Sequence, residues 1–122
     1  MQFTRVEDYY AVSRITGPKH NLLLLRLEVG NQNIPECECL PPIGSCTHKP
    51  LNETELVAKV VEGVSEANAQ FGTQYSATHI RYIQNDTGPE VVYGFLALKI
   101  IEHLVMGGQF LLAQPSKGKN AL

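Results

Sequence analysis

The stretch from Val91 to Val105 constrains the fold of this 122-residue chain more than any other. Its apolar residues cover far more than a third of a helical surface, and Lys99, Glu102 and His103 make only a narrow polar strip. A helix that is apolar on nearly all sides has to be covered on two of them, by its own sheet and by a further surface. The sequence therefore predicts a long buried helix and favours a homo-oligomer over a monomer.

The residues before this helix are suited to two different roles. Pro89 is typical of a first helical turn, and Glu90 suits the positive end of the helix dipole. A helix N-terminus with free backbone N–H groups binds phosphate or another anion, and Asn85 and Thr87 add hydrogen-bonding side chains. The alternative is that Asp86 or Thr87 simply caps the helix.

Composition excludes several classes of protein. Hydrophobic residues make up 43% of the chain and charged residues 18%, which is typical of one globular domain over residues 1–122. Ten basic and twelve acidic residues give a net charge of -2, so a nucleic acid polymer is not an expected partner. No apolar run approaches the roughly 20 residues of a membrane span, and the N-terminus lacks the apolar core of a signal peptide. We therefore expect no membrane partner and a cytoplasmic location.

Hydrophobic periodicity predicts an α+β domain with two layers, in which a mainly antiparallel sheet carries two helices on one face. Residues 34–51 form an irregular segment rich in proline and cysteine, and residues 114–122 form a loose C-terminal tail. In chain order, the expected elements are a strand over Phe3–Ile15, a strand over Asn21–Val29, a short edge strand over Glu36–Leu40, a helix capped by Asn52 with Glu55 as its capping-box partner and ended by Gly72, a strand over Ala77–Gln84, the long helix ended by Gly107, and a short strand over Gln109–Ala113.

The face of the sheet turned away from the helices is expected to mix leucine and arginine. The predicted core face of the second strand consists of Leu23, Leu25, Leu27 and Val29, and alternation places other residues on the far face. Those residues are Leu22, Leu24 and Arg26 from one strand, and His79 and Arg81 from another. Such a mixture suits a subunit interface or a ligand wall better than a surface in water.

The cysteine-rich segment contains the residues that most resemble metal ligands. Cys37, Cys39, Cys46 and His48 could together give a tetrahedral zinc site. Their spacing lacks the two-to-four-residue gap common in structural zinc sites, so ordinary buried thiols are the alternative. We therefore expect no metal, and a zinc-dependent enzyme remains a third-ranked alternative.

The remaining candidate residues favour recognition over catalysis. None of the four histidines has the spacing of a catalytic triad or a metal-hydrolase pair, and no phosphate-binding glycine motif is present. Arginine forks match phosphates, tyrosine rings stack on bases, and amide or hydroxyl groups bond sugars. The alternative for each tyrosine is a place in the core or an interface. The predicted ligand-binding residues are Arg14, Arg26, Arg81, Tyr82, Asn85, Asp86 and Thr87.

Two stretches carry a family resemblance: EDYYAVSRITGPKHNLLLLRLE near the start and YIQNDTGPEVVYGFLALKIIEHL later. Together they resemble the small phage-encoded Thoeris anti-defence proteins of the first type, and the resemblance covers most of the chain. It implies an oligomeric sponge that is not an enzyme and needs no cofactor. Such a sponge holds a small cyclic ADP-ribose signal so that the bacterial effector is never switched on. The resemblance lies in the overall pattern and assigns no binding residue.

A second resemblance concerns the stretch VVEGVSEANAQFG, which leads into a strand and then the long apolar helix. This order is similar to that in the fourth domain of translation elongation factor G. It implies a shared architecture, which does not fix function. The remaining alternative is a protein–protein inhibitor module that acts through the apolar sheet face.

Overall fold

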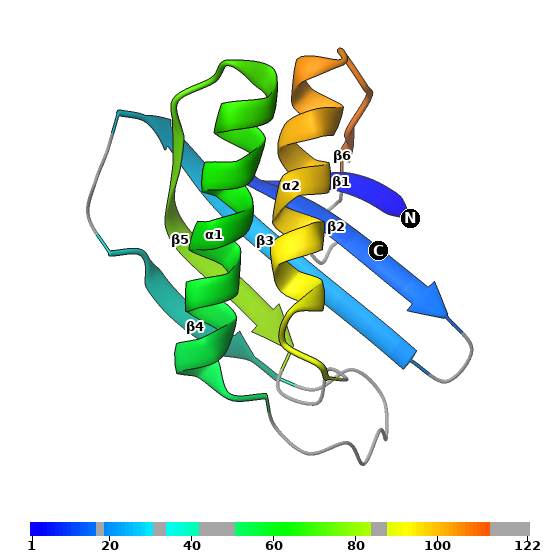
Figure 1. Cartoon of the computed structure of the whole chain (residues 1–122). Helices are drawn as coiled ribbons and strands as arrows, with labels where there is room; N and C mark the ends of the chain where they lie inside the picture. Colours follow the sequence, from blue (N-terminus) through cyan, green and yellow to red (C-terminus); the bar gives the residue numbers. More distant parts are fainter. Residues whose placement is uncertain (17–18, 31–33, 42–50, 84–87, 113–122) are drawn as a thin grey trace.

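The computed structural model describes residues 1–16, 19–30, 34–41, 51–83 and 88–112. In chain order, the elements within them are β1 (Gln2–Val6), β2 (Tyr9–Thr16), β3 (Lys19–Val29), β4 (Glu36–Leu40), α1 (Glu53–Phe71), β5 (Tyr75–Ile83), α2 (Val92–Val105) and β6 (Leu111–Leu112). The strands form one sheet in the order β4-β5-β3-β2-β1-β6, and both helices lie on one face of it (Figure 1). This confirms the predicted α+β class.

The sheet is mixed rather than wholly antiparallel. Strands β1, β2, β3 and β5 pair antiparallel with one another. The outer strands β4 and β6 pair in parallel with β5 and β1. The predicted edge strand Glu36–Leu40 is therefore present, and a helix crosses from it to β5 because parallel neighbours cannot be joined by a tight turn.

The hydrophobic core lies between the sheet and the two helices. Leu23 and Leu25 of β3 are fully buried on the helix side, together with Ile80 of β5, which confirms the predicted core face for these two leucines. Val29, predicted on the same face, is 73% exposed, because it ends the strand beyond a register shift after Arg26. From the helix layer, α1 contributes Leu56 and Val60. Burying each such side chain contributes roughly 1.5–3 kcal/mol, so these contacts fix how the helices lie on the sheet.

The prediction of one strand over Phe3–Ile15 was wrong. Val6 pairs with Tyr9, and Glu7 and Asp8 form a tight hairpin turn between β1 and β2. Glu7 has a left-handed backbone conformation with φ of 56°, which usually calls for glycine, asparagine or aspartate. The alternation of apolar residues continues on both sides of the turn, so it gave no sign of the break.

The start of α1 joins the two helices. Asn52 caps α1, because its side-chain oxygen accepts a hydrogen bond of 3.0 Å from the Glu55 backbone N–H. A complete capping box would also have the Glu55 carboxylate accept from the Asn52 N–H. Here the Asn52 N–H donates instead to the Glu90 carboxylate, at 2.8 Å. A residue just before α2 thus helps to cap α1, which ties the two helix starts together.

The helices approach closely where two glycines meet. A Cβ atom added to Gly63 of α1 would lie 2.1 Å from the backbone oxygen of Gly94 in α2. A Cβ atom on Gly94 would lie 2.8 Å from the Lys59 backbone oxygen. Such distances are too short for any side chain, so the absence of side chains allows the helix backbones to come into contact.

Helix α2 is covered on two sides, as its composition predicted. Tyr93, Leu96 and Ile100 are fully buried between the sheet and α1. The second cover is α1 of the same chain, so the apolar character of α2 does not by itself require another subunit. Val91 and Phe95 remain exposed, and a homo-oligomer stays a prediction. No helix within the described residues is long and apolar enough to cross a membrane.

Candidate functional site

Of the predicted ligand-binding residues, the four that the structure describes do not lie together in one chain. Register places Arg26 and Arg81 on the far face of the sheet, beside His79 and Leu24, as predicted. Arg14 and Tyr82 belong to the helix side, because Arg14 lies near Phe95 of α2 and Tyr82 is part of the main core. Asn85, Asp86 and Thr87 lie outside the described residues.

On the helix side, Arg14 belongs to a group that we call the Phe95 cluster: Arg14, Asn21, Tyr93, Phe95 and Lys99. The Arg14 Cζ atom lies 5.8 Å from the centre of the Phe95 ring, and the Lys99 Nζ atom lies 5.5 Å from it. Asn21 pairs with Arg14 in the sheet and donates a hydrogen bond of 3.1 Å from its amide to the Tyr93 hydroxyl. Strands β2 and β3 are thereby joined to the first turn of α2.

Within the Phe95 cluster, the charge that favours an anion is that of Arg14, because Glu62 and Glu66 of α1 line a pocket with Phe95. Within the described part of the chain, no carboxylate lies within ion-pair distance of Arg14. Lys99 forms an ion pair with Glu102 at 2.8 Å. Phe95 is 44% exposed, so part of its side chain is accessible to a ligand. A guanidinium without an acidic partner, next to an open ring, can bind a phosphate and a base together.

The start of α2 offers fewer backbone donors than the sequence predicted. The helix begins at Val92, and Val91 at its N-cap makes no side-chain capping bond. The first helical N–H groups bond to the carbonyls of Pro89, Glu90 and Val91 at 3.0 to 3.1 Å. Those three N–H groups are therefore engaged, and an anion held here would need other donors.

The far-face arginines are paired with acids. Arg26 bonds to Asp8 at 2.6 Å, and the Arg81 Nε atom bonds to Glu38 at 2.9 Å. Both guanidiniums lie over the buried Tyr9 ring, with Cζ atoms 5.4 and 4.3 Å from its centre. Desolvation raises the pKa of Asp8, but the hydrogen bond and the charge of Arg26 lower this pKa by more, so it lies below its usual value. These arginines are already oriented and largely neutralised.

Tyr82 is not placed to stack on a ligand. Its side chain is buried, and its hydroxyl donates to the Glu53 carboxylate at 2.9 Å. Burial raises the pKa of Tyr82, and the nearby Glu53 raises it further. The hydroxyl therefore stays protonated and fastens the start of α1 to β5.

The cysteines of β4 lie on the helix side of the strand. Burial raises the pKa of Cys37 to about 12, with smaller contributions from Glu53 and Cys39. A thiol that stays protonated is a poor nucleophile and a poor metal ligand. Cys46 and His48 lie outside the described residues, and the described ones contain no group of three side chains that could hold a metal ion.

We expect Cys37 to react with iodoacetamide at least tenfold more slowly than Cys39 at pH 8. A pKa three units above its usual value lowers the thiolate fraction by about a thousandfold, and Cys39 is exposed. The comparison uses Cys39→Ser and Cys37→Ser, each in a Cys46→Ser background, with mass spectrometry to follow labelling. Both thiols should react alike in urea, and equal rates in the native protein would contradict the burial of Cys37.

The same shift predicts how stability depends on alkaline pH. The unfolded thiol ionises above about pH 9, whereas the folded thiol stays protonated up to about pH 12. The contribution of Cys37 is therefore fully present below pH 9 and is lost as the pH rises towards 12. Cys37→Ser should flatten that part of the stability curve.

No family model, curated protein or solved structure matches this chain. The resemblances to the Thoeris anti-defence proteins and to the fourth domain of elongation factor G therefore remain predictions. The candidate site rests on the chemistry of the chain itself.

The sequence pointed to Arg14 as a candidate, but not to its neighbours Phe95 and Asn21. Phe95 counted as one more apolar residue of a buried helix, and Asn21 as the first residue of a strand. A usable signal was the position of Phe95 relative to the polar strip, since it lies one turn before Lys99 on the same side of α2. That spacing places an aromatic ring next to a cation.

Proposed function

We propose that this protein is a non-catalytic sponge that sequesters a cyclic ADP-ribose-type nucleotide. In the cytosol of a bacterial host it would thereby block the Thoeris anti-phage defence. The ligand class comes from the resemblance to the first type of Thoeris anti-defence proteins. The observation that carries the proposal is Arg14, a half-buried guanidinium with no acidic partner in the described residues, beside the open ring of Phe95.

Each group of the Phe95 cluster has a role that follows from its chemistry. Arg14 holds a phosphate through its fork of N–H donors. The exposed Phe95 ring stacks on the adenine, which takes over the role first assigned to the buried Tyr82. Asn85 and Thr87, which follow β5 in the sequence, supply hydrogen bonds to ribose or phosphate.

Arg26 and Arg81 join this site only if a second copy of the chain supplies them. They lie on the opposite face of the sheet from Arg14, so one chain cannot place all three arginines around a small ligand. A homo-oligomer in which the far face of one copy meets the Phe95 cluster of another would enclose the ligand. Enclosure by preformed walls is what tight capture without chemistry requires.

Calorimetry with cyclic ADP-ribose isomers tests the proposal directly. The expected result is binding to the native protein that Arg14→Gln weakens by about 10- to 100-fold, the effect of losing a charge-assisted hydrogen bond worth roughly 1.5–3 kcal/mol. Phe95→Leu, which keeps an apolar side chain but loses the ring, should weaken binding at least tenfold. Arg5→Gln is the matched control, because Arg5 is also an arginine over an aromatic ring, that of Tyr10 on the neighbouring strand, and it should change affinity less than twofold.

Chemical analysis of the bound ligand separates a sponge from an enzyme. Ligand released from the complex by heat should have an unchanged mass and retention time, whereas a hydrolysed product would show an enzyme. If the native protein binds none of the cyclic ADP-ribose isomers or cyclic oligonucleotides, nucleotide capture is ruled out.

A second candidate is a protein–protein inhibitor module that acts through the far face of the sheet. It is favoured by the paired charges there: Arg26 and Arg81 already have acidic partners, next to the partly buried Leu22 and Leu40. Such a surface suits another protein better than an anion. If the protein is such a module, no nucleotide should raise its melting temperature. It should bind a partner protein, and Arg81→Glu should abolish that binding.

A further inference from the structure

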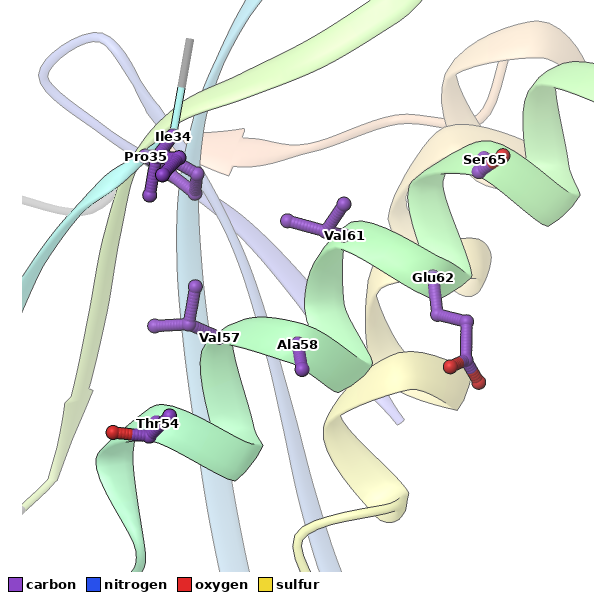
Figure 2. Close-up of a pocket in the computed structure, with 8 residues that line it drawn as sticks. All are labelled: Ile34, Pro35, Thr54, Val57, Ala58, Val61, Glu62 and Ser65. Carbon is purple, nitrogen blue, oxygen red and sulfur yellow. The ribbon is translucent and has the colours of Figure 1, made fainter.

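Among the strands that the structure describes, β4 lies at one edge of the sheet, and an apolar groove lies beside it. Among the described strands, β4 comes first in the sheet and pairs only with β5. The groove has a volume of about 590 Å³ and lies between α1 and the two residues that lead into β4, Ile34 and Pro35 (Figure 2). Ile34 is 87% exposed and Val61 of α1 is 46% exposed. Exposed apolar side chains thus lie next to a strand edge that no other described strand pairs with.

The groove is built from a second stripe of α1, separate from its core-facing side. Val57 and Val61, one turn apart, point across the groove towards Ile34 and Pro35 (Figure 2). Ala58 has a small side chain and therefore fills little of the groove. The rim is polar and consists of Thr54, Glu62 and Ser65. An apolar floor with a polar rim is the usual anatomy of a docking site.

The register of β4 determines what an added strand would meet. Cys37 pairs with Ile80 of the core and faces the helices, so Glu36 and Glu38 face the other way. Alternate side chains of a strand laid along β4 would point under α1, against Val57 and Val61. The side chains between them would lie beside the two glutamates, at the distance of a cross-strand pair.

The charge at this edge selects the occupant. The Glu36 and Glu38 side chains are 83% and 60% exposed. On β5, Glu36 contacts His79 and Glu38 contacts Arg81. Glu62, at the rim of the groove on the helix side, is already paired with Lys59 at 3.8 Å. A second copy of β4 would bring like charges opposite each other, which is unfavourable. A basic segment fits.

We propose that β4 accepts an extended segment of a partner protein in which apolar and basic residues alternate. The segment adds to the sheet as a further strand, because main-chain hydrogen bonds to the outer edge of β4 supply affinity and alternate side chains supply specificity. Its apolar side chains fill the groove against Val57 and Val61. Its lysines or arginines lie beside Glu36 and Glu38. This surface is at the opposite edge of the sheet from β1 and β6 and does not depend on nucleotide binding.

The test uses a blocked, fluorescent peptide of alternating lysine and valine, with binding followed by anisotropy. Saturable binding to the full chain is expected, and a glutamate–valine peptide should not bind. The double variant Glu36→Lys/Glu38→Lys should bind the lysine–valine peptide at least tenfold more weakly and gain binding to the glutamate–valine peptide. Glu7→Lys/Glu66→Lys, with both changes at exposed positions outside β4, makes the same change in net charge and should change affinity less than twofold for either peptide.

Two further arms separate strand addition from a general attraction of charges. A lysine–valine peptide that is N-methylated at alternate residues cannot donate hydrogen bonds to β4 and should bind at least tenfold more weakly. Val61→Lys should weaken binding to a similar extent, and circular dichroism verifies that the exposed position tolerates the change. The proposal is overturned if the native protein does not bind the peptide, if both charge forms bind equally, or if N-methylation has no effect.

Discussion

Replacing Gly63 by alanine is expected to lower the free energy of unfolding by about 2–3 kcal/mol, the usual cost of forcing extra volume into a packed interior. The added Cβ atom would lie 2.1 Å from the Gly94 backbone oxygen, so the two helices would have to move apart. The loss exceeds the roughly 1 kcal/mol that alanine gains over glycine in a helix. Urea unfolding followed by circular dichroism measures the change.

The neighbouring positions supply an internal scale for this result. Gly94→Ala should cost less, because its added Cβ would lie 2.8 Å from the Lys59 backbone oxygen. Ser65→Ala, on the exposed side of α1, should be neutral or slightly stabilising. A Gly63→Ala protein as stable as the native one would mean that the helices do not approach as closely as described.

Replacing Asn68 by alanine is expected to lower the free energy of unfolding by about 2 kcal/mol, because a partly buried hydrogen-bonded group is lost. Its amide donates to the Tyr75 carbonyl at 2.8 Å. Its side-chain oxygen accepts from the Tyr75 N–H at 3.0 Å and from the Thr73 hydroxyl at 2.8 Å. One side chain therefore holds the turn that leads from α1 into β5.

Two variants show whether the loss comes from these bonds. Thr73→Ala removes one of the three and should cost about 1 kcal/mol. Gln70→Ala, in the same turn of α1 but exposed, should leave the stability unchanged. If Asn68→Ala costs no more than Gln70→Ala, Asn68 does not hold the turn.

Much of the fold could be predicted because burial follows periodicity. The alternation around Leu23 and Leu25 identified the core face of β3, and the spacing of Leu56, Val60 and Val64 identified α1. The turn at Glu7 escaped prediction, because neither Glu7 nor Asp8 is followed by the glycine that usually marks a two-residue hairpin. Turn chemistry is local, and here the tertiary pairing of β1 and β2 overrides it.

The candidate site was harder to predict, since it depends on which side of the sheet each residue faces. Arg14, Arg26 and Arg81 look alike in the sequence. In the structure, however, Arg26 pairs with Asp8, and Arg81 pairs with Glu38 of β4. Arg14 meets a phenylalanine from α2 instead. Strand order decides such encounters, and no short-range pattern encodes the insertion of β5 between β3 and β4.

That insertion has a consequence for the chain while it is being made. Strand β3 finds one neighbour, β2, at once through a short hairpin, but its other neighbour, β5, ends only at residue 83. Until β5 emerges from the ribosome, the edge of β3 is unpaired along its run of leucines. Open apolar edges pair readily with other chains. Fragments that end before β5 should therefore aggregate, and the nascent protein is most in need of a chaperone during this interval.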